Sequence, residues 1–186
     1  INKLITEDNR IRLVNQERQG GVIANFNKAL IMTSAPYVVT CDQDDIWPRD
    51  RLEKFFLFIR NHETKDNIPI LVFSDLTLVD KNGDKIADSF YKYNKINPLD
   101  NLKDNNLIWR CTIYGCTMIF NRQLLTISLP IPTAALMHDQ WLALQAKKFG
   151  KILYLDYQSV FYRQHDNNEV GGNKKNLYGK LLNLDK

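Results

Sequence analysis

The chain has 186 residues, of which 44% are hydrophobic and 25% are charged, as in ordinary folded globular proteins. This composition excludes collagen, coiled coils and disordered chains. The net charge of +4 is mild and gives no argument for a nucleic-acid partner, and no apolar run approaches the ~18 residues of a membrane-spanning helix.

The first third of the chain alternates strand and helix signals. Residues 11–15 alternate apolar and polar side chains, which predicts a short strand. After Gly20-Gly21, apolar residues recur at helical spacing as far as Thr33. Residues 37–41 are β-branched and apolar, which is typical of a buried strand. Pro48 is well placed to open a helix with an apolar face, formed by Leu52, Phe55, Phe56 and Ile59.

The remaining elements suggest a mixed sheet. The Asn82-Gly83 dipeptide between alternating segments is typical of a hairpin turn. Helices are predicted over residues 99–109 and 138–149, and further strands over residues 70–73, 117–120, 152–155 and 159–162. We therefore predict an α/β fold in one domain, residues 1–172, whose mixed sheet is flanked by helices, followed by a polar tail over residues 173–186.

The three cysteines do not indicate a disulfide framework. Cys41, Cys111 and Cys116 form no C-x-x-C pair, so they predict neither a set of disulfides nor a zinc site. The chain also begins with Ile1, and no signal-peptide pattern follows. We expect a reduced, cytoplasmic protein, and a chain that is part of a longer one.

An acidic cluster follows the strand at residues 37–41. Asp42 and Asp44 point the same way in an extended chain, roughly 6–7 Å apart, and Asp45 follows them. Three carboxylates packed together repel one another unless a cation binds. Ligands of open α/β sheets lie beyond the carboxyl ends of the strands, where this cluster is. The pattern favours a Mg²⁺ or Mn²⁺ site completed by water and a substrate phosphate.

Two other interpretations of the cluster remain open. It could be a solvated turn with one aspartate capping the next helix, although a cap needs only one. It could also carry the nucleophile pair of a metal phosphohydrolase, a reading weakened by Ile46-Trp47, which stand where that class has a Thr or Val.

The chain resembles family 2 glycosyltransferases of the GT-A fold, and their rhamnosyltransferase-like branch above all. The resemblance rests on the ordered segments 21–30, 42–47, 115–121, 138–143 and 162–168, which read GVIANFNKAL, DQDDIW, GCTMIFN, HDQWLA and YRQHDNN. It covers nearly the whole chain, from about residue 11 to residue 172. It implies a GT-A, Rossmann-like mixed sheet.

The resemblance also implies an N-terminally truncated domain. Family members begin with a strand that bears a Tyr-Asn pair and a second strand that ends in Asp-Asp-Gly-Ser, and these segments hold the nucleotide. Neither segment is present in this chain. We therefore expect residues 1–172 to be the later two-thirds of a catalytic domain.

The family's mechanism implies a metal site and a base. By resemblance, Asp44 is the best metal ligand, Asp42 contributes to ribose or metal, and His165 completes the metal shell or touches the diphosphate. Asp139 is the best catalytic base for the acceptor hydroxyl. From the residues alone, Asp139 reads as a helix N-terminal residue that interacts with the helix dipole.

The remaining site residues follow from the same resemblance. The donor-binding residues would be Gly21, Asn25 and Arg163, together with Asp42. On the acceptor side, the resemblance and the aromatic side chains point to four residues, namely Trp47, Gly115, Cys116 and His138.

These assignments predict an inverting, metal-dependent glycosyltransferase of cell-surface polysaccharide synthesis. The donor would be dTDP-rhamnose or a UDP-sugar, and the acceptor a saccharide or lipid-linked saccharide, with no nucleic-acid partner. We expect action in the cytoplasm, compatible with peripheral association at the inner face of the plasma membrane. A non-catalytic fragment or binding module is the main alternative, and a metal phosphohydrolase is a weaker one.

Overall fold

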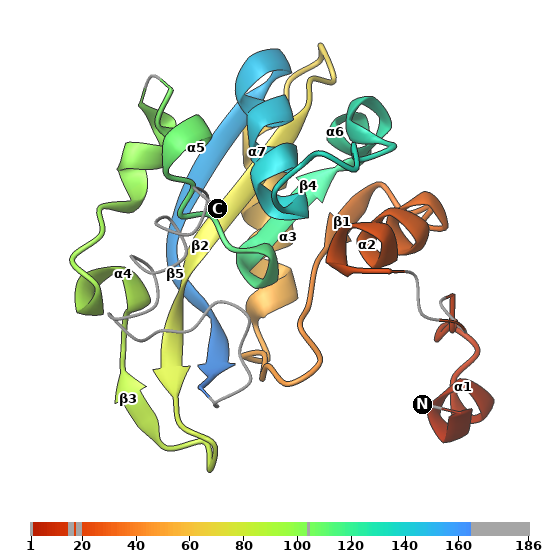
Figure 1. Cartoon of the computed structure of the whole chain (residues 1–186), viewed down its shortest axis with the longest axis vertical. Coiled ribbons are helices and arrows are strands. Elements are labelled where there is room, and N and C mark those ends of the chain that lie inside the picture. The colour runs from red at the N-terminus through yellow and green to blue at the C-terminus, as the bar shows by residue number, and fades with distance from the viewer. Residues whose placement is uncertain (1, 15–16, 18–19, 104, 165–186) are drawn as a thin grey trace, which may run out of the picture.

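A five-stranded mixed sheet forms the centre of the computed structural model (Figure 1). The structure describes residues 2–14, 17, 20–103 and 105–164. β1 pairs with β4, β4 with β2, and β2 with β3, and all three pairs are antiparallel. β5 pairs in parallel with β2, along the edge of β2 opposite β4. The strands are β1 (Tyr37–Val39), β2 (Ile70–Val79), β3 (Lys85–Ala87), β4 (Met118–Asn121) and β5 (Lys151–Arg163).

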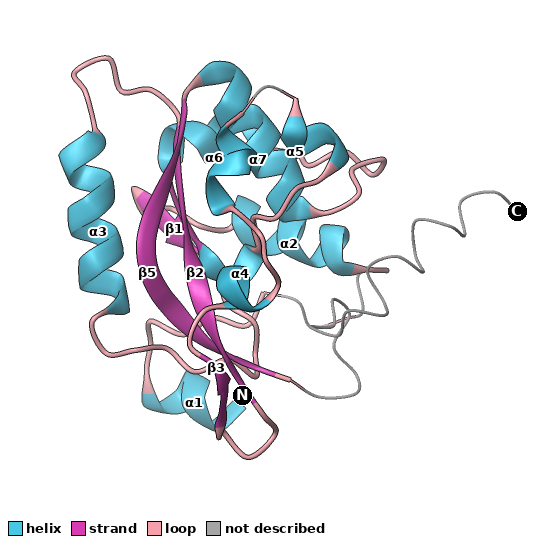
Figure 2. Cartoon of the chain, turned by 90° about the vertical axis from the view of Figure 1, so that its left-hand side faces the viewer, coloured by secondary structure: helices cyan, strands magenta, loops and turns pink. Residues whose placement is uncertain are grey.

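Helices cover both faces of the sheet (Figure 2). One face is covered by α3 (Arg51–His62). The other carries most of the remaining helices, which are α2 (Val22–Ile31), α4 (Phe90–Tyr93), α5 (Asn106–Trp109), α6 (Arg122–Ser128) and α7 (His138–Phe149). A short helix, α1 (Asn2–Glu7), and two 3₁₀ turns, η1 (Pro98–Leu102) and η2 (Gly115–Thr117), complete the described elements.

The long central strand β2 is buried at every position because helices lie on both of its faces. Alternate side chains point to opposite faces. Leu71 and Phe73 join the large core under α7, whereas Ile70 and Val72 pack with Phe55 and other side chains in a smaller cluster under α3. The unbroken apolar strand thus separates two hydrophobic layers.

Several sequence-based predictions are confirmed. The sheet is mixed, β2 and β3 are joined through the predicted Asn82-Gly83 turn, and α7 spans the predicted residues 138–149. The three cysteines are free thiols. The strands predicted over residues 152–155 and 159–162 form one strand, β5, and the residues between them bulge out of β5 opposite Asp75 of β2. The predicted polar tail over residues 173–186 lies outside the described residues.

Two predicted elements were wrong. Residues 11–14 form no strand, since no strand among the described residues pairs with them and Ile11 and Leu13 are exposed. Residues 99–109 are not one helix but the separate elements η1 and α5. The buried Asn101 side chain accepts from the Thr112 amide at 2.9 Å and donates to the Thr112 hydroxyl at 2.7 Å. These bonds tie η1 to the segment that follows α5, so the chain folds back instead of continuing as one helix.

Within the part of the chain that the structure describes, every helix is too short or too polar to cross a bilayer. The topology places two segments together at one edge of the sheet. The C-terminal end of β1 pairs with the N-terminal end of β4, with Val39 opposite Ile119. The residues that follow β1 therefore lie beside η2, which precedes β4.

Candidate active site

The segment Asp42–Asp45, called the acidic loop below, is tied to its surroundings at both ends. Just before it, the Thr40 hydroxyl donates to the Gly115 carbonyl. Just after it, Ile46 and Phe161 exchange two backbone hydrogen bonds of 3.2 and 2.9 Å. The Arg163 guanidinium also donates to the Asp44 carbonyl at 3.3 Å. The acidic loop is thus held between η2 and the end of β5.

Asp42 and Asp45 converge on Cys116. One carboxylate oxygen of each aspartate and the Cys116 sulfur all lie within 4.8 Å of one another, and Asp44 is not in this group. Both Asp45 carboxylate oxygens are buried, and none of the described residues gives them a hydrogen bond of good geometry, although the Cys116 thiol and the Arg163 amide lie near. Burial, and then the charges of Asp42 and Asp44, raise the pKa of Asp45 to about 7, against a smaller opposing effect of the Cys116 thiol and the Arg163 amide.

Asp139 stands in the first turn of α7 and faces the same edge. Its Oδ2 accepts the Gly115 amide at 3.1 Å and its Oδ1 accepts the Gln140 amide at 2.7 Å, so both oxygens are oriented. Burial raises the pKa of Asp139 to about 6 although these two amides lower it, and the charge of Asp42 adds to the rise. A carboxylate of this kind is suited to accept a proton near neutral pH.

His138 is almost fully buried beside Asp139. Its ring stacks on Phe26 of α2 with centroids 3.5 Å apart, and neither ring nitrogen has a hydrogen-bond partner in the described chain. Burial lowers the pKa of His138 to about 4, so the ring is neutral at physiological pH. The predicted acceptor residue His138 therefore packs α2 against the helix end that carries Asp139.

Gly115 allows this close packing. A Cβ atom at this position would lie 2.6 Å from His138 Nε2 and 3.8 Å from Asp139 Oδ2. We expect Gly115→Ala to destabilise the protein by roughly 1–3 kcal/mol, as overpacking does, and to lower activity by shifting Asp139. Urea unfolding measures the first effect. If the ring causes the clash, Gly115→Ala and His138→Ala will be clearly non-additive in the double variant, whereas strict additivity would contradict this explanation.

A fully buried arginine, which the sequence analysis did not select, supports the acidic loop. Arg51 donates to the carbonyls of Cys116 at 2.6 Å, Ser159 at 3.2 Å and Thr40 at 3.5 Å. Its guanidinium also lies 4.0 Å from the centroid of the Trp47 ring. Burial lowers the pKa of Arg51 to about 10, so it keeps its positive charge at neutral pH.

The other predicted site residues lie on several different elements of the fold. Trp47 is half-buried beneath the Arg51 guanidinium, and its indole N–H has no partner among the described residues. Gly21 caps α2 and Asn25 is exposed on that helix. The Arg163 guanidinium is engaged with backbone carbonyls, including that of Lys81 at 2.7 Å. His165 lies outside the described residues, so its predicted metal role stays a prediction.

Comparison with known proteins places this arrangement in a family. The model of glycosyl transferase family 2 matches residues 1–142, which is more than half of the chain. The chain belongs to glycosyltransferase family 2. The family match includes the acidic loop, η2 and the first turn of α7 with Asp139, and the mixed α/β sheet agrees with the predicted fold class. The family to which the chain belongs is a family of glycosyltransferases.

Curated relatives that match the chain are also named as sugar transferases. An uncharacterized glycosyltransferase of Methanocaldococcus jannaschii is 33% identical over 48% of this chain and 31% of its own length. A putative teichuronic acid biosynthesis glycosyltransferase of Bacillus subtilis is 27% identical over 76% of this chain and 52% of its own length. A dTDP-rhamnosyl transferase of Shigella flexneri is 26% identical over 83% and 53%. The chain thus spans about half the length of these relatives, or less.

Proposed function

We propose that this protein is a glycosyltransferase, which transfers a sugar from a nucleoside diphosphate to an acceptor hydroxyl with inversion at the anomeric carbon and with a divalent cation. The observation that carries the proposal is that an oriented carboxylate, Asp139, lies at the same edge of the sheet as the converging Asp42 and Asp45. A base and a cation-binding group are the two requirements of this reaction.

The bond changes assign a role to Asp139. The acceptor oxygen forms a bond to the anomeric carbon on one face, while the bond from that carbon to the diphosphate oxygen breaks on the other face. The acceptor proton moves to the Asp139 carboxylate, and the electron pair of the broken bond leaves with the diphosphate. The Gly115 and Gln140 amides orient the two oxygens of that carboxylate for the proton transfer.

The acidic loop fits a hard divalent cation. Among the described residues, only the weak influence of the Cys116 thiol and the Arg163 amide opposes the burial of the Asp45 oxygens, and the raised pKa of this carboxyl reflects the cost of a negative charge there without a cation. Mg²⁺ and Mn²⁺ bind such oxygens together with water and phosphate, and would neutralise the departing diphosphate. Burial raises the pKa of the Cys116 thiol, which makes it a poor ligand for these ions. We assign Asp42 and Asp45 as ligands, with Asp44 still a predicted one.

The relatives support a place in cell-surface polysaccharide synthesis. One is named for teichuronic acid biosynthesis and another for dTDP-rhamnosyl transfer. We therefore propose dTDP-rhamnose as the first donor to test and UDP-sugars as the second, with a saccharide or lipid-linked saccharide as acceptor. We also propose action in the cytoplasm, at the inner face of the plasma membrane.

Product analysis tests this function. The protein is incubated with dTDP-rhamnose or a UDP-sugar, Mn²⁺ and a saccharide acceptor, and NMR reports the anomeric configuration of the product. We expect one inverted glycoside that forms only without a chelator. A retained configuration, or equal turnover with excess EDTA, would contradict inversion or metal dependence. Phosphate release from simple esters would favour a phosphohydrolase, and Mn²⁺ binding with no product from any donor would favour a binding module.

A further inference from the structure

The group of side chains at the acidic loop contains a sulfur as well as carboxylate oxygens. Cys116 lies in η2 and is only 3% exposed. Its Sγ and one oxygen each of Asp42 and Asp45 all lie within 4.8 Å of one another. Metal–oxygen and metal–sulfur bonds of about 2.0–2.3 Å place the ligands of one ion roughly 3–4 Å apart. The three atoms are therefore close enough to meet on a single ion after a small movement.

Hydrogen bonds that do not use these three atoms hold the sulfur beside the carboxylates. Arg51 donates to the Cys116 carbonyl at 2.6 Å, and the Thr40 hydroxyl donates to the Gly115 carbonyl. The buried guanidinium also brings a positive charge close to the thiol, which partly offsets the cost of a thiolate at this buried position. The two segments that supply the ligands are thus tied together by contacts that need no ion.

The thiol gives the site a second kind of metal chemistry. Mg²⁺ and Mn²⁺ prefer carboxylate, water and phosphate oxygens, and they leave a thiol protonated. Zn²⁺ and Cd²⁺ bind a thiolate strongly, and Zn²⁺ in proteins usually has four ligands drawn from thiolates, imidazoles, carboxylates and water. Asp42, Asp45 and Cys116 would supply three of these four. An ion of this class should therefore bind more tightly here than Mg²⁺ or Mn²⁺.

We propose that Asp42, Asp45 and Cys116 form an inhibitory site for thiophilic divalent ions, of which Zn²⁺ is the biological representative. The inhibition rests on the proposed function, because Zn²⁺ would displace the cation that binds the diphosphate. When the ion binds, the S–H bond of Cys116 breaks, the sulfur forms a bond to zinc, and the proton leaves to water, with no change of oxidation state.

Charge and coordination explain why bound zinc would inhibit. Two carboxylates and Mn²⁺ have no net charge, whereas two carboxylates, a thiolate and Zn²⁺ carry one net negative charge. The zinc form should therefore repel a diphosphate that the manganese form can bind. Four-coordinate zinc also has a single position left after three protein ligands, whereas an octahedral ion keeps several positions for water and phosphate.

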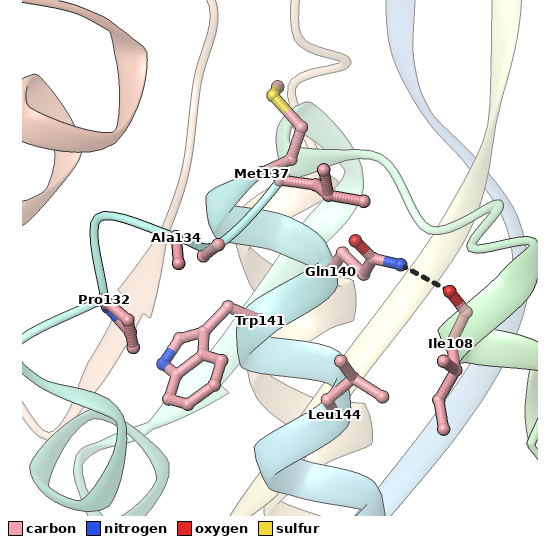
Figure 3. Close-up of a pocket in the computed structure, with 9 residues that line it drawn as sticks. Ile108, Pro132, Ala134, Met137, Gln140, Trp141 and Leu144 are labelled. Atoms are coloured by element: carbon pink, nitrogen blue, oxygen red, sulfur yellow. Dashed lines mark hydrogen bonds between the residues drawn. The ribbon is translucent and has the colours of Figure 1, made fainter. Parts of the chain in front are cut away.

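The apolar pocket of about 320 Å³ beside α7 has a different chemistry (Figure 3). None of the described residues that line it carries a carboxylate, a thiol or an imidazole. The sulfur seen there is the Met137 thioether, and the Gln140 side-chain amide already donates to the Ile108 carbonyl at 3.3 Å. Binding of a thiophilic ion through a thiolate is therefore expected at Cys116 and not in this pocket.

A Cd²⁺ titration followed by ultraviolet absorption tests the site without donor or acceptor, because a cadmium–thiolate bond has a charge-transfer band that oxygen ligands do not give. We expect the band to saturate at one Cd²⁺ per chain. It should disappear in Cys116→Ser and in Cys116→Ala, and calorimetry should find Cd²⁺ binding weaker by roughly tenfold or more. Cys41→Ser and Cys111→Ser, which replace the other two thiols, are the matched controls and should keep the band.

The carboxylate side of the site has its own test. Asp45→Asn keeps the thiol and should also weaken Cd²⁺ binding by roughly tenfold or more. Absence of the band from the wild-type protein, or a band that persists in both Cys116 variants, would overturn the proposal. So would unchanged Cd²⁺ affinity in Asp45→Asn, because the thiol would then bind the ion without the acidic loop.

Transfer assays separate this inference from the proposed function. With Mn²⁺ present, Zn²⁺ should inhibit sugar transfer, and the Zn²⁺ concentration that halves each protein's own rate should be roughly tenfold higher or more in Cys116→Ser than in wild type. If the band forms but no sugar is transferred to any acceptor, the proposed function fails and the thiolate site stands. If sugar is transferred and Zn²⁺ supports it as well as Mn²⁺ does, the inference fails and the proposed function stands.

Discussion

Asp139→Asn is expected to lower kcat of sugar transfer by roughly 10²–10⁴-fold, the usual contribution of a positioned base. Asparagine has the same shape and keeps an oxygen for the Gly115 amide, so the fold should survive. Steady-state kinetics with saturating donor and acceptor measure the effect. Asp66→Asn, at an exposed aspartate remote from the sheet edge in sequence and fold, is the control. Near-normal turnover in Asp139→Asn would show that another group accepts the proton.

The raised pKa of Asp139 gives the pH dependence and its sign. A base must be deprotonated, so wild-type activity should fall as the pH drops through about 6. Stability should change in the opposite sense. The pKa of Asp139 in the folded protein lies above its ordinary value of 3.8, so the protonated form stabilises the fold below that value, and this contribution is lost as the pH rises through about 6. As the pH rises from 4 to 7, the free energy of unfolding of Asp139→Asn, measured in urea, should therefore increase relative to that of the wild type.

Arg51→Met is expected to destabilise the protein by about 3–5 kcal/mol, as breaking a buried charged network does. The substitution leaves the carbonyls of Cys116, Ser159 and Thr40 without their donor and removes the cation from Trp47. Since domains are stable by only about 5–15 kcal/mol, this variant should be partly unfolded or strongly shifted in urea.

A control on the same helix separates this effect from loss of any arginine. Arg60 is exposed, and its Nε lies 3.6 Å from Glu63 Oε2. Because exposed ion pairs contribute little to stability, Arg60→Met should change the free energy of unfolding by less than about 1 kcal/mol. If both variants unfold at the same urea concentration as wild type, the buried arginine does not hold the acidic loop. Arg51→Lys should be intermediate, because an ammonium cannot reach all three carbonyls in one plane.

Local patterns were enough to predict the strands of the sheet and three of the helices that pack on it, α2, α3 and α7. The β-branched run at β1, the apolar run at β2 and the periodic face of α7 each match one buried element. The helix predicted over residues 99–109 failed because Asn101 bonds to Thr112, eleven residues away, and no periodicity reveals such a contact. Tertiary hydrogen bonding replaced local propensity there.

The candidate site was predicted in part for a similar reason. Asp42 and Asp139 follow recognisable signals, a buried strand end and a helix start. The approach of Asp45 to Cys116 depends on the pairing of β1 with β4, which sequence spacing does not encode. Arg51 could have been found, because it lies on the same helical face as Phe55 and Ile59, at positions i, i+4 and i+8, and all three are buried. An arginine on the apolar face of a helix indicates that its guanidinium is buried and donates to hydrogen-bond acceptors in the interior.

Mn²⁺ titration tests the cation site most directly. Calorimetry with UDP present should find one Mn²⁺ per chain, and Asp42→Asn or Asp45→Asn should weaken binding at least tenfold while Asp66→Asn leaves it unchanged; Asp44→Asn, run in the same series, decides whether the third aspartate is also a ligand. Absence of Mn²⁺ binding to the wild-type protein, or equal affinity in Asp42→Asn, Asp45→Asn and wild type, would contradict a cation held by the acidic loop.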